Sequence, residues 1–148
     1  MNNTSFFQKQ DKIALIGVSA NTAKFGYKAF EFLIKNDYKA VPVNPGAAEI
    51  AGVACVNDIS ELPPDVMRAV VLTPQKHTDE VLRQLSEKGI REVWVQQMCQ
   101  SPRSENLSSE RDLNARFGKC LFLHAEPVKG IHAFHRGLLK LFGRYKSQ

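Results

Sequence analysis

The stretch KIALIGVSANTAKFGYKAFEFLIKNDYKAVPVNP, residues 12–45, decides the fold of this chain. Its apolar run at 13–16 predicts a buried strand, and a loop of small residues follows. Residues 26–36 place Phe30, Leu33 and Ile34 at helical spacing, and the short apolar run at 40–43 predicts a second strand. A strand, a helix and a strand in this order form one βαβ unit with parallel strands.

The same alternation continues along the chain. We predict further strands at 69–72, 92–95 and 120–123, helices at 76–88 and 104–116 that stop at Gly89 and Gly118, and a closing helix at 130–142. Alternating strands and helices with short links predict an α/β, three-layer, doubly wound Rossmann-like fold with a five-stranded, mostly parallel sheet. We predict one domain over residues 12–148, preceded by an N-terminal extension at 1–11.

The composition fits one soluble domain. The 148 residues are 43% hydrophobic and 24% charged, and no apolar stretch approaches the roughly 20 residues that a membrane helix needs. With no secretory signal at the N-terminus, we expect a cytoplasmic protein without a membrane partner. The net charge of +5 suits an anionic ligand, but the basic residues are scattered, which makes nucleic acid an unlikely partner. Three cysteines without a CxxC pair indicate neither a disulfide framework nor a zinc knuckle.

The first loop lacks the signature of an NAD site. That signature is GxGxxG after the first strand, with an acid after the second strand that binds the ribose. Here the loop reads Gly17-Val18-Ser19-Ala20-Asn21, the next glycine is Gly26, and the second strand ends at Asn44. Both parts of the signature are therefore missing.

The loop still suits a phosphate group. Ser19 supplies a hydroxyl, and Gly26 lies where a helix begins and its N–H groups carry partial positive charge. Lys24 and Lys28 add full charges beside that helix end, although such lysines are often only solvated side chains. The residues alone therefore favour an anionic, phosphate-bearing ligand of another kind.

Residues 12–45 resemble the small CoA-binding Rossmann proteins, relatives of the nucleotide-binding domain of the succinyl-CoA synthetase alpha subunit. The similarity extends to about residue 120 and includes the segment GIREVWVQ at 89–96. It implies that the loop at 17–25 wraps the diphosphate of coenzyme A or acyl-CoA, while residues after the second and third strands flank the adenosine. The cofactor-binding residues predicted in this way are Gly17, Val18, Ser19, Ala20, Asn21, Lys24, Phe25, Gly26, Lys28, Asn44, Pro45, Thr73, Pro74 and Gln96.

Charge agrees with this resemblance at the second strand. Coenzyme A carries a ribose 3′-phosphate besides its diphosphate, so an acid at the end of that strand would repel it, whereas Asn44 does not. The chain departs from its relatives at 97–102, where they commonly have a glycine-containing loop, and again after the fifth strand. It has no room for the phosphohistidine segment and second domain of the synthetase, so we expect no ligase activity.

Our leading hypothesis is a binding module without catalytic machinery that senses, carries or regulates through CoA, with a homodimer or a protein partner as possible assemblies. The alternative is a small enzyme that acts on a CoA thioester through Cys99 or the C-terminal histidines. An NAD-binding redox sensor is a third reading. His124, His132 and His135 have metal-ligand side chains, but their spacing matches no standard zinc motif, and we predict no metal centre.

Overall fold

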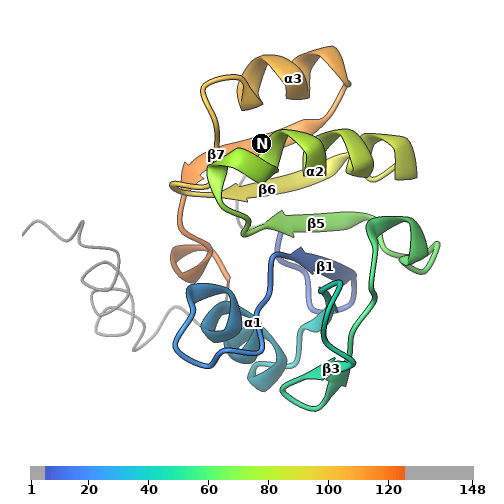
Figure 1. The fold of residues 1–148 in the computed structure, drawn as a ribbon, viewed down its shortest axis with the longest axis vertical. Coiled ribbons are helices and arrows are strands. Elements are labelled where there is room, and N and C mark those ends of the chain that lie inside the picture. The colour runs from blue at the N-terminus through green and yellow to red at the C-terminus, as the bar shows by residue number, and fades with distance from the viewer. Residues whose placement is uncertain (1–5, 126–148) are drawn as a thin grey trace, which may run out of the picture.

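A parallel five-stranded sheet forms the centre of the computed structural model, which describes residues 6–125 (Figure 1). The elements in chain order are β1 (Lys12–Ile16), α1 (Phe25–Lys35), β2 (Lys39–Val43), β3 (Glu49–Ile50), β4 (Val53–Ala54), the 3₁₀ turn η2 (Ile59–Glu61), β5 (Arg68–Val71), α2 (Gln75–Lys88), β6 (Glu92–Gln96), α3 (Ser104–Glu110), β7 (Asn114–Lys119) and the 3₁₀ turn η3 (Leu121–Leu123). The strand order is β2-β1-β5-β6-β7, and every neighbouring pair is parallel. The predicted α/β doubly wound fold is confirmed.

Helices cover both faces of the sheet, as Figure 1 shows. Ile13 and Leu15 of β1 pack in the cluster that contains α1, whereas Ala14 and Ile16 pack in the cluster that contains α2 and α3. Successive side chains of a strand point to opposite faces, so a strand covered on both faces reads as a continuous apolar run. This is why β1, β2, β5 and β6 were visible in the sequence. Within the described residues, no helix is both long and apolar enough to span a membrane.

The three α-helices within residues 6–125 end in the same way, with one residue in the left-handed conformation. This residue is Asp37 (φ 68°) after α1, Gly89 (φ 88°) after α2 and Asp112 (φ 57°) after α3. In each case the next amide donates back five residues, as from Leu113 N–H to the Ser108 carbonyl (2.8 Å). Gly89 was predicted as a stop. Asp112 was not, although Asp tolerates this conformation better than most residues.

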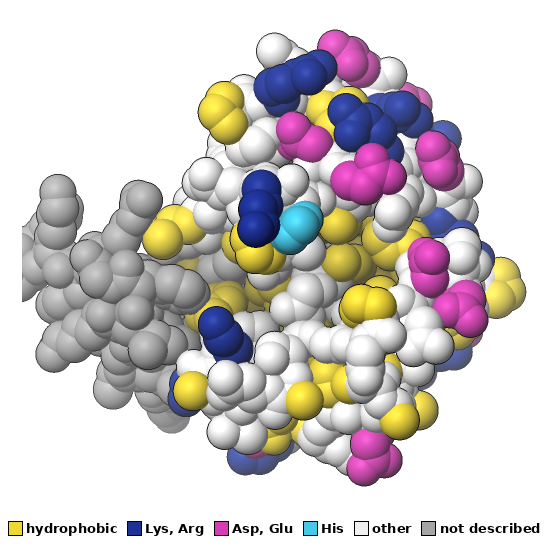
Figure 2. Space-filling view, viewed as in Figure 1, with side chains coloured by type: hydrophobic (Ala, Val, Ile, Leu, Met, Phe, Trp, Pro, Cys, Tyr) yellow, Lys and Arg dark blue, Asp and Glu magenta, His cyan; other side chains and the backbone are white. Residues whose placement is uncertain are grey.

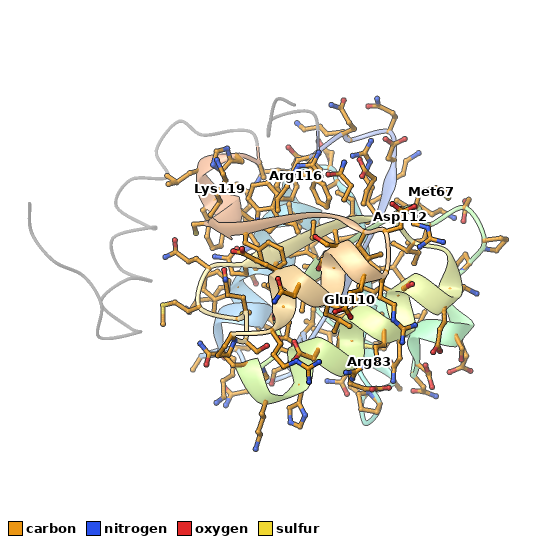
Figure 3. The ribbon with its side chains drawn as sticks, turned by 90° about the horizontal axis from the view of Figure 1, so that it is seen from above. Met67, Arg83, Glu110, Asp112, Arg116 and Lys119 are labelled. Carbon is orange, nitrogen blue, oxygen red and sulfur yellow. The ribbon has the colours of Figure 1, made fainter. Side chains whose placement is uncertain are left out.

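The predictions for residues 104–123 are wrong in detail. The third helix ends at Glu110 rather than at 116, the fifth strand is β7, and the predicted strand at 120–123 contains the turn η3. Along β7, Ala115 and Phe117 pack with the α2 and α3 cluster, whereas Arg116 lies on the opposite face, away from α3 (Figure 3). A buried arginine at an apolar-face position hides the period of two that marks a strand.

Gly118 belongs to a bulge and does not stop a helix. Trp94 pairs with Arg116 and Gln96 pairs with Lys119, so two residues of β7 lie opposite Val95. Gly118 takes φ 73° in this extra position. The bulge explains why the glycine, read alone, looked like a helix end.

A short antiparallel hairpin of β3 and β4, absent from the sequence prediction, lies beside β2. Val56 forms an isolated parallel bridge with Val43, and its N–H donates to the Pro42 carbonyl (2.9 Å). In return, its carbonyl accepts from the N–H of Asn44 (2.9 Å). The hairpin therefore returns the chain to the carboxyl end of β2.

Phe6 and Phe7, within the predicted extension, belong to the hydrophobic core. The Phe6 ring lies 5.5 Å from the Trp94 ring, and the guanidinium groups of Arg116 and Arg68 lie 5.1 and 5.6 Å from its centre. These rings cover part of the sheet on the same face as α1. The predicted closing helix at 130–142 lies outside the described residues.

The substitution Phe6→Ala tests this packing. Since the Phe6 ring is fully buried, its loss should lower the free energy of unfolding by about 3–5 kcal/mol, measured by urea denaturation of the full chain. Met67, 58% exposed, provides the control, and Met67→Ala should change stability by less than about 0.5 kcal/mol. Equal effects of the two substitutions would contradict a structural role for Phe6.

Candidate functional site

Two adjoining pockets lie at the carboxyl ends of the strands, where the strand order reverses between β1 and β5. We call them the loop pocket (about 390 Å³) and the hairpin pocket (about 460 Å³). They share Gly17 and Thr73. Figure 2 shows the corresponding hollow between α2 above and the elements α1 and β3 below, with apolar side chains at its floor. Ligands of doubly wound folds bind at this reversal point.

The loop pocket is formed by the first loop and two other strand ends. The first loop contributes Gly17, Ser19, Lys24, Phe25 and Gly26. The opposite wall consists of residues 72–74 after β5 and residues 96–99 at and after the end of β6. The loop between Gly17 and Phe25 is therefore one wall of a pocket, and its predicted contact with a ligand stays a prediction.

Two glycines bring the backbones around this pocket into close contact. Gly17 has φ 97°, and a Cβ atom there would lie 2.9 Å from the backbone of Leu72 and Thr73. A Cβ atom on Gly26 would lie 2.8 Å from the Gly17 carbonyl oxygen. Only glycine fits both positions, so the missing pieces of the dinucleotide signature do not make this loop irregular.

Hydrogen bonds within the first loop fix its shape. Ser19 Oγ accepts from the Asn21 N–H (3.0 Å), and Asn21 Oδ1 accepts from the Ala23 N–H (3.0 Å). The Asn21 carbonyl then accepts from the N–H of Lys24, which precedes α1 and gives it no side-chain cap. Asn21 therefore shapes the loop but does not line the pocket. Its side-chain oxygen bonds to Ala23, so it does not occupy the N–H groups at the start of α1.

Asn44 joins the first loop to the turn after β2. Its Nδ2 donates to the Val18 carbonyl (2.7 Å), and its Oδ1 accepts from the N–H groups of Gly46 (2.7 Å) and Ala47 (3.0 Å). An aspartate at this position could not donate to the Val18 carbonyl and would place negative charge against it. The hydrogen bond to Val18 is therefore a structural reason for an amide instead of an acid at this position, independent of any ligand.

The loop after β6 is anchored to the first turns of α2. Thr78 Oγ1 donates to the Cys99 carbonyl (2.6 Å), and the Asp79 carboxylate accepts from the hydroxyls of Ser101 (2.7 Å) and Ser104 (3.0 Å). Met98 takes the left-handed conformation (φ 73°), which glycine adopts most readily. Met98 thus stands where a glycine would fit, and it also lines the loop pocket.

The polar groups farther along this wall are mainly structural. Gln96 Oε1 accepts from the Leu121 N–H (3.0 Å), which fixes the start of η3 to the end of β6. Burial raises the pKa of the Cys99 thiol to about 11. The thiol is therefore protonated at neutral pH, which opposes a role as nucleophile.

The histidine cluster can be followed only in part. The His124 ring lies 5.3 Å from the Trp94 ring, and burial, followed by the charge of Lys119, lowers the His124 pKa. His132 and His135 lie outside the described residues. Across residues 6–125, no group of three or more metal-ligating side chains comes together.

The hairpin pocket brings together residues that sequence reasoning missed. Its walls include the chain at 57–59, which the β3 and β4 hairpin returns to the end of β2, and one face of α2. That face carries His77, Val81 and Gln84 at helical spacing, a signal that the sequence did offer. Asp58 also lines this pocket, so an acidic residue from the chain after the hairpin belongs to the same pocket as Asn44.

The structure places most of the predicted cofactor-binding residues at these pockets. The loop pocket contains Gly17, Ser19, Lys24, Phe25, Gly26, Thr73, Pro74 and Gln96. Val18, Asn44 and Pro45 line the hairpin pocket, whereas Ala20, Asn21 and Lys28 line neither. Residues far apart in the chain therefore meet at one cleft, and their contacts with a ligand stay predictions.

Comparison with known proteins identifies relatives of this arrangement. A 93-residue stretch is 33% identical to the alpha subunit of an ADP-forming acetate–CoA ligase II from Pyrococcus furiosus and covers 61% of this chain. An 89-residue stretch is 36% identical to the alpha subunit of ligase I from the same organism. The chain spans about a fifth of the length of these relatives, since the matches cover 20% and 19% of them.

Solved structures agree on the fold. A conserved hypothetical protein from Pyrococcus furiosus has a TM-score of 0.73 at 32% identity, over 76% of this chain and 97% of that one. A protein from Thermus thermophilus has a TM-score of 0.73 at 21% identity, over 84% of this chain and 96% of that one.

The family comparison covers nearly the whole described structure. The family described as CoA binding domain matches residues 11–126, which include every strand that the structure describes and both pockets. The chain belongs to this family of CoA-binding domains.

Proposed function

We propose that this chain binds coenzyme A or acyl-CoA across the two pockets, with the diphosphate against the loop at 17–25. The observation that carries the proposal is that the start of α1 lines the loop pocket. This helix start has no side-chain cap, and Lys24 lies beside it. N–H groups at a helix start and a nearby lysine stabilise a phosphate. Family membership supports CoA as the source of that phosphate.

The two ends of the ligand then lie in different pockets. In doubly wound folds the adenosine ribose lies at the end of the second strand, which here is the hairpin pocket at Asn44. The pantetheine arm extends through the loop pocket, where Phe25 and Met98 offer apolar contact. The thiol or acyl group would then approach Cys99.

The proposed role is that of a non-catalytic module in the cytoplasm that senses or carries an acyl-CoA, or regulates a partner. The relatives named as acetate–CoA ligases are about five times longer than the stretch matched here. The raised pKa of Cys99 weighs against the alternative of a thioester enzyme that uses this thiol. The NAD-sensor alternative lacks the usual ribose-binding acid at the end of β2, where Asn44 stands instead.

Selective stabilisation is the first test of this proposal. Millimolar CoA and acetyl-CoA should raise the melting temperature of the full chain, because a ligand that binds only the folded state stabilises it by mass action. NAD and ATP at the same concentration serve as comparisons in the same thermal-shift assay. A clear shift with NAD and none with CoA would reject the proposal.

The position of the diphosphate is tested by Lys24→Glu, with Lys28→Glu as the matched control. Lys28 lies one turn later on the helix and lines neither pocket, so both variants change the net charge equally. Charge reversal beside the diphosphate should weaken CoA binding by about tenfold or more in calorimetric titration, and reversal at Lys28 by less than about threefold. Equal losses would show that Lys24 acts only through the overall charge.

The state of the Cys99 thiol is tested by its alkylation rate. With a pKa of about 11, the rate should still rise with pH above about pH 9, because only the thiolate reacts. Peptide mapping by mass spectrometry separates Cys99 from Cys55 and Cys120. A rate that levels off near neutral pH would instead indicate an activated nucleophile and favour the enzyme alternative.

A further inference from the structure

The hairpin pocket has the wrong charge for one of the phosphates of CoA. The residues that line it, all within residues 6–125, include the acidic residue Asp58 and no lysine or arginine. His77 is the only one of them that can carry a positive charge. Lys24 lines the loop pocket and not the hairpin pocket. The shared residues Gly17 and Thr73 stand between the two.

Asp58 is fixed in its position. Its Oδ1 accepts from the Ser60 N–H (3.0 Å) and so caps η2. The chain on either side is held as well, since Val56 bonds to β2 on one side and the Ser60 carbonyl accepts from Lys88 Nζ (2.9 Å) on the other. The carboxylate therefore cannot turn away from the start of η2 without loss of the cap.

The negative character continues beyond the pocket. A further hollow of about 370 Å³ begins at Asp58 and Gln84, and Glu80, Glu87 and Lys88 line it. Figure 2 shows basic side chains above and below the left part of the hollow and acidic side chains beside its right end. Charge along the cleft thus changes from positive near the first loop to negative beyond the end of β2.

We infer that the hairpin pocket accepts an adenosine ribose with free hydroxyls, so that this chain prefers a CoA compound without the ribose 3′-phosphate. The inference rests on the proposed function, which places the diphosphate at the first loop. A carboxylate accepts hydrogen bonds from ribose hydroxyls, as in dinucleotide sites, whereas it repels a phosphate at the same place. The ligand class is an adenosine diphosphate with a pantetheine arm, of which dephospho-CoA is the available probe.

The test compares CoA with dephospho-CoA by calorimetric titration of the full chain. Dephospho-CoA should bind about threefold to tenfold more tightly, as expected for one carboxylate and a phosphate a few ångströms apart in partly solvated surroundings. The ratio should fall at high salt, because exposed charges are screened. Lys24→Glu should weaken both ligands by the same factor, since both carry the diphosphate.

Two matched variants assign the preference to Asp58. Asp58→Asn removes the charge and keeps an oxygen that can accept from the Ser60 N–H, so the cap is preserved. Glu61→Gln removes an equal charge from the same short turn at a residue outside the hairpin pocket. The ratio of the two affinities should approach one in Asp58→Asn and stay at the wild-type value in Glu61→Gln.

The outcomes separate the inference from the proposed function. If CoA binds as tightly as dephospho-CoA or more tightly, the inference is wrong and the proposed function stands. If neither compound binds, the proposed function fails and the inference fails with it. A preference that persists in Asp58→Asn would overturn the assignment to this carboxylate.

Discussion

The close approach of Gly17 to the backbone of Leu72 and Thr73 is the constraint on which the cleft depends. A side chain at Gly17 would collide with that backbone, and the positive φ of this residue excludes most alternatives to glycine. The first loop thereby touches the end of β5 and separates the two pockets that share these residues. Gly26 imposes a second constraint of the same kind. The start of α1 packs against the carbonyl of Gly17, and a side chain at residue 26 would collide with it.

Around this contact, side-chain to backbone hydrogen bonds hold the other loops. Asn44 joins the turn after β2 to Val18, and Thr78 joins the start of α2 to Cys99. Asp79 gathers the hydroxyls of Ser101 and Ser104. A cleft whose walls are bonded to one another in this way loses little conformational entropy when a ligand binds.

The cleft is also electrically uneven. Lys24 and the start of α1 favour anions at one end, whereas Asp58 and the carboxylates beyond it oppose them at the other. Family membership explains a site for a CoA-type ligand, but it does not fix which phosphates that site tolerates. In the proposed binding mode, the distribution of charge along the cleft sets that selectivity.

Local signals in the sequence determined the strands β1, β2, β5 and β6, the helices α1 and α2, and the first loop with its glycines. These elements are short apolar runs or clear helical repeats, whose period survives without knowledge of their neighbours. The end of α3 and the strand β7 could not be predicted in the same way. Asp112 took the place of a helix-ending glycine, and the buried Arg116 and the bulge at Gly118 broke the alternation.

Only the tertiary structure decided what stands beside Asn44. The sequence showed that no acid ends the second strand, and it suggested a pocket open to phosphate at that end. The hairpin then returns the chain through the bridge between Val43 and Val56, and this pairing puts Asp58 in the same pocket. The local sequence specifies which charged residues a loop contains. Long-range backbone pairing decides which pocket those residues line.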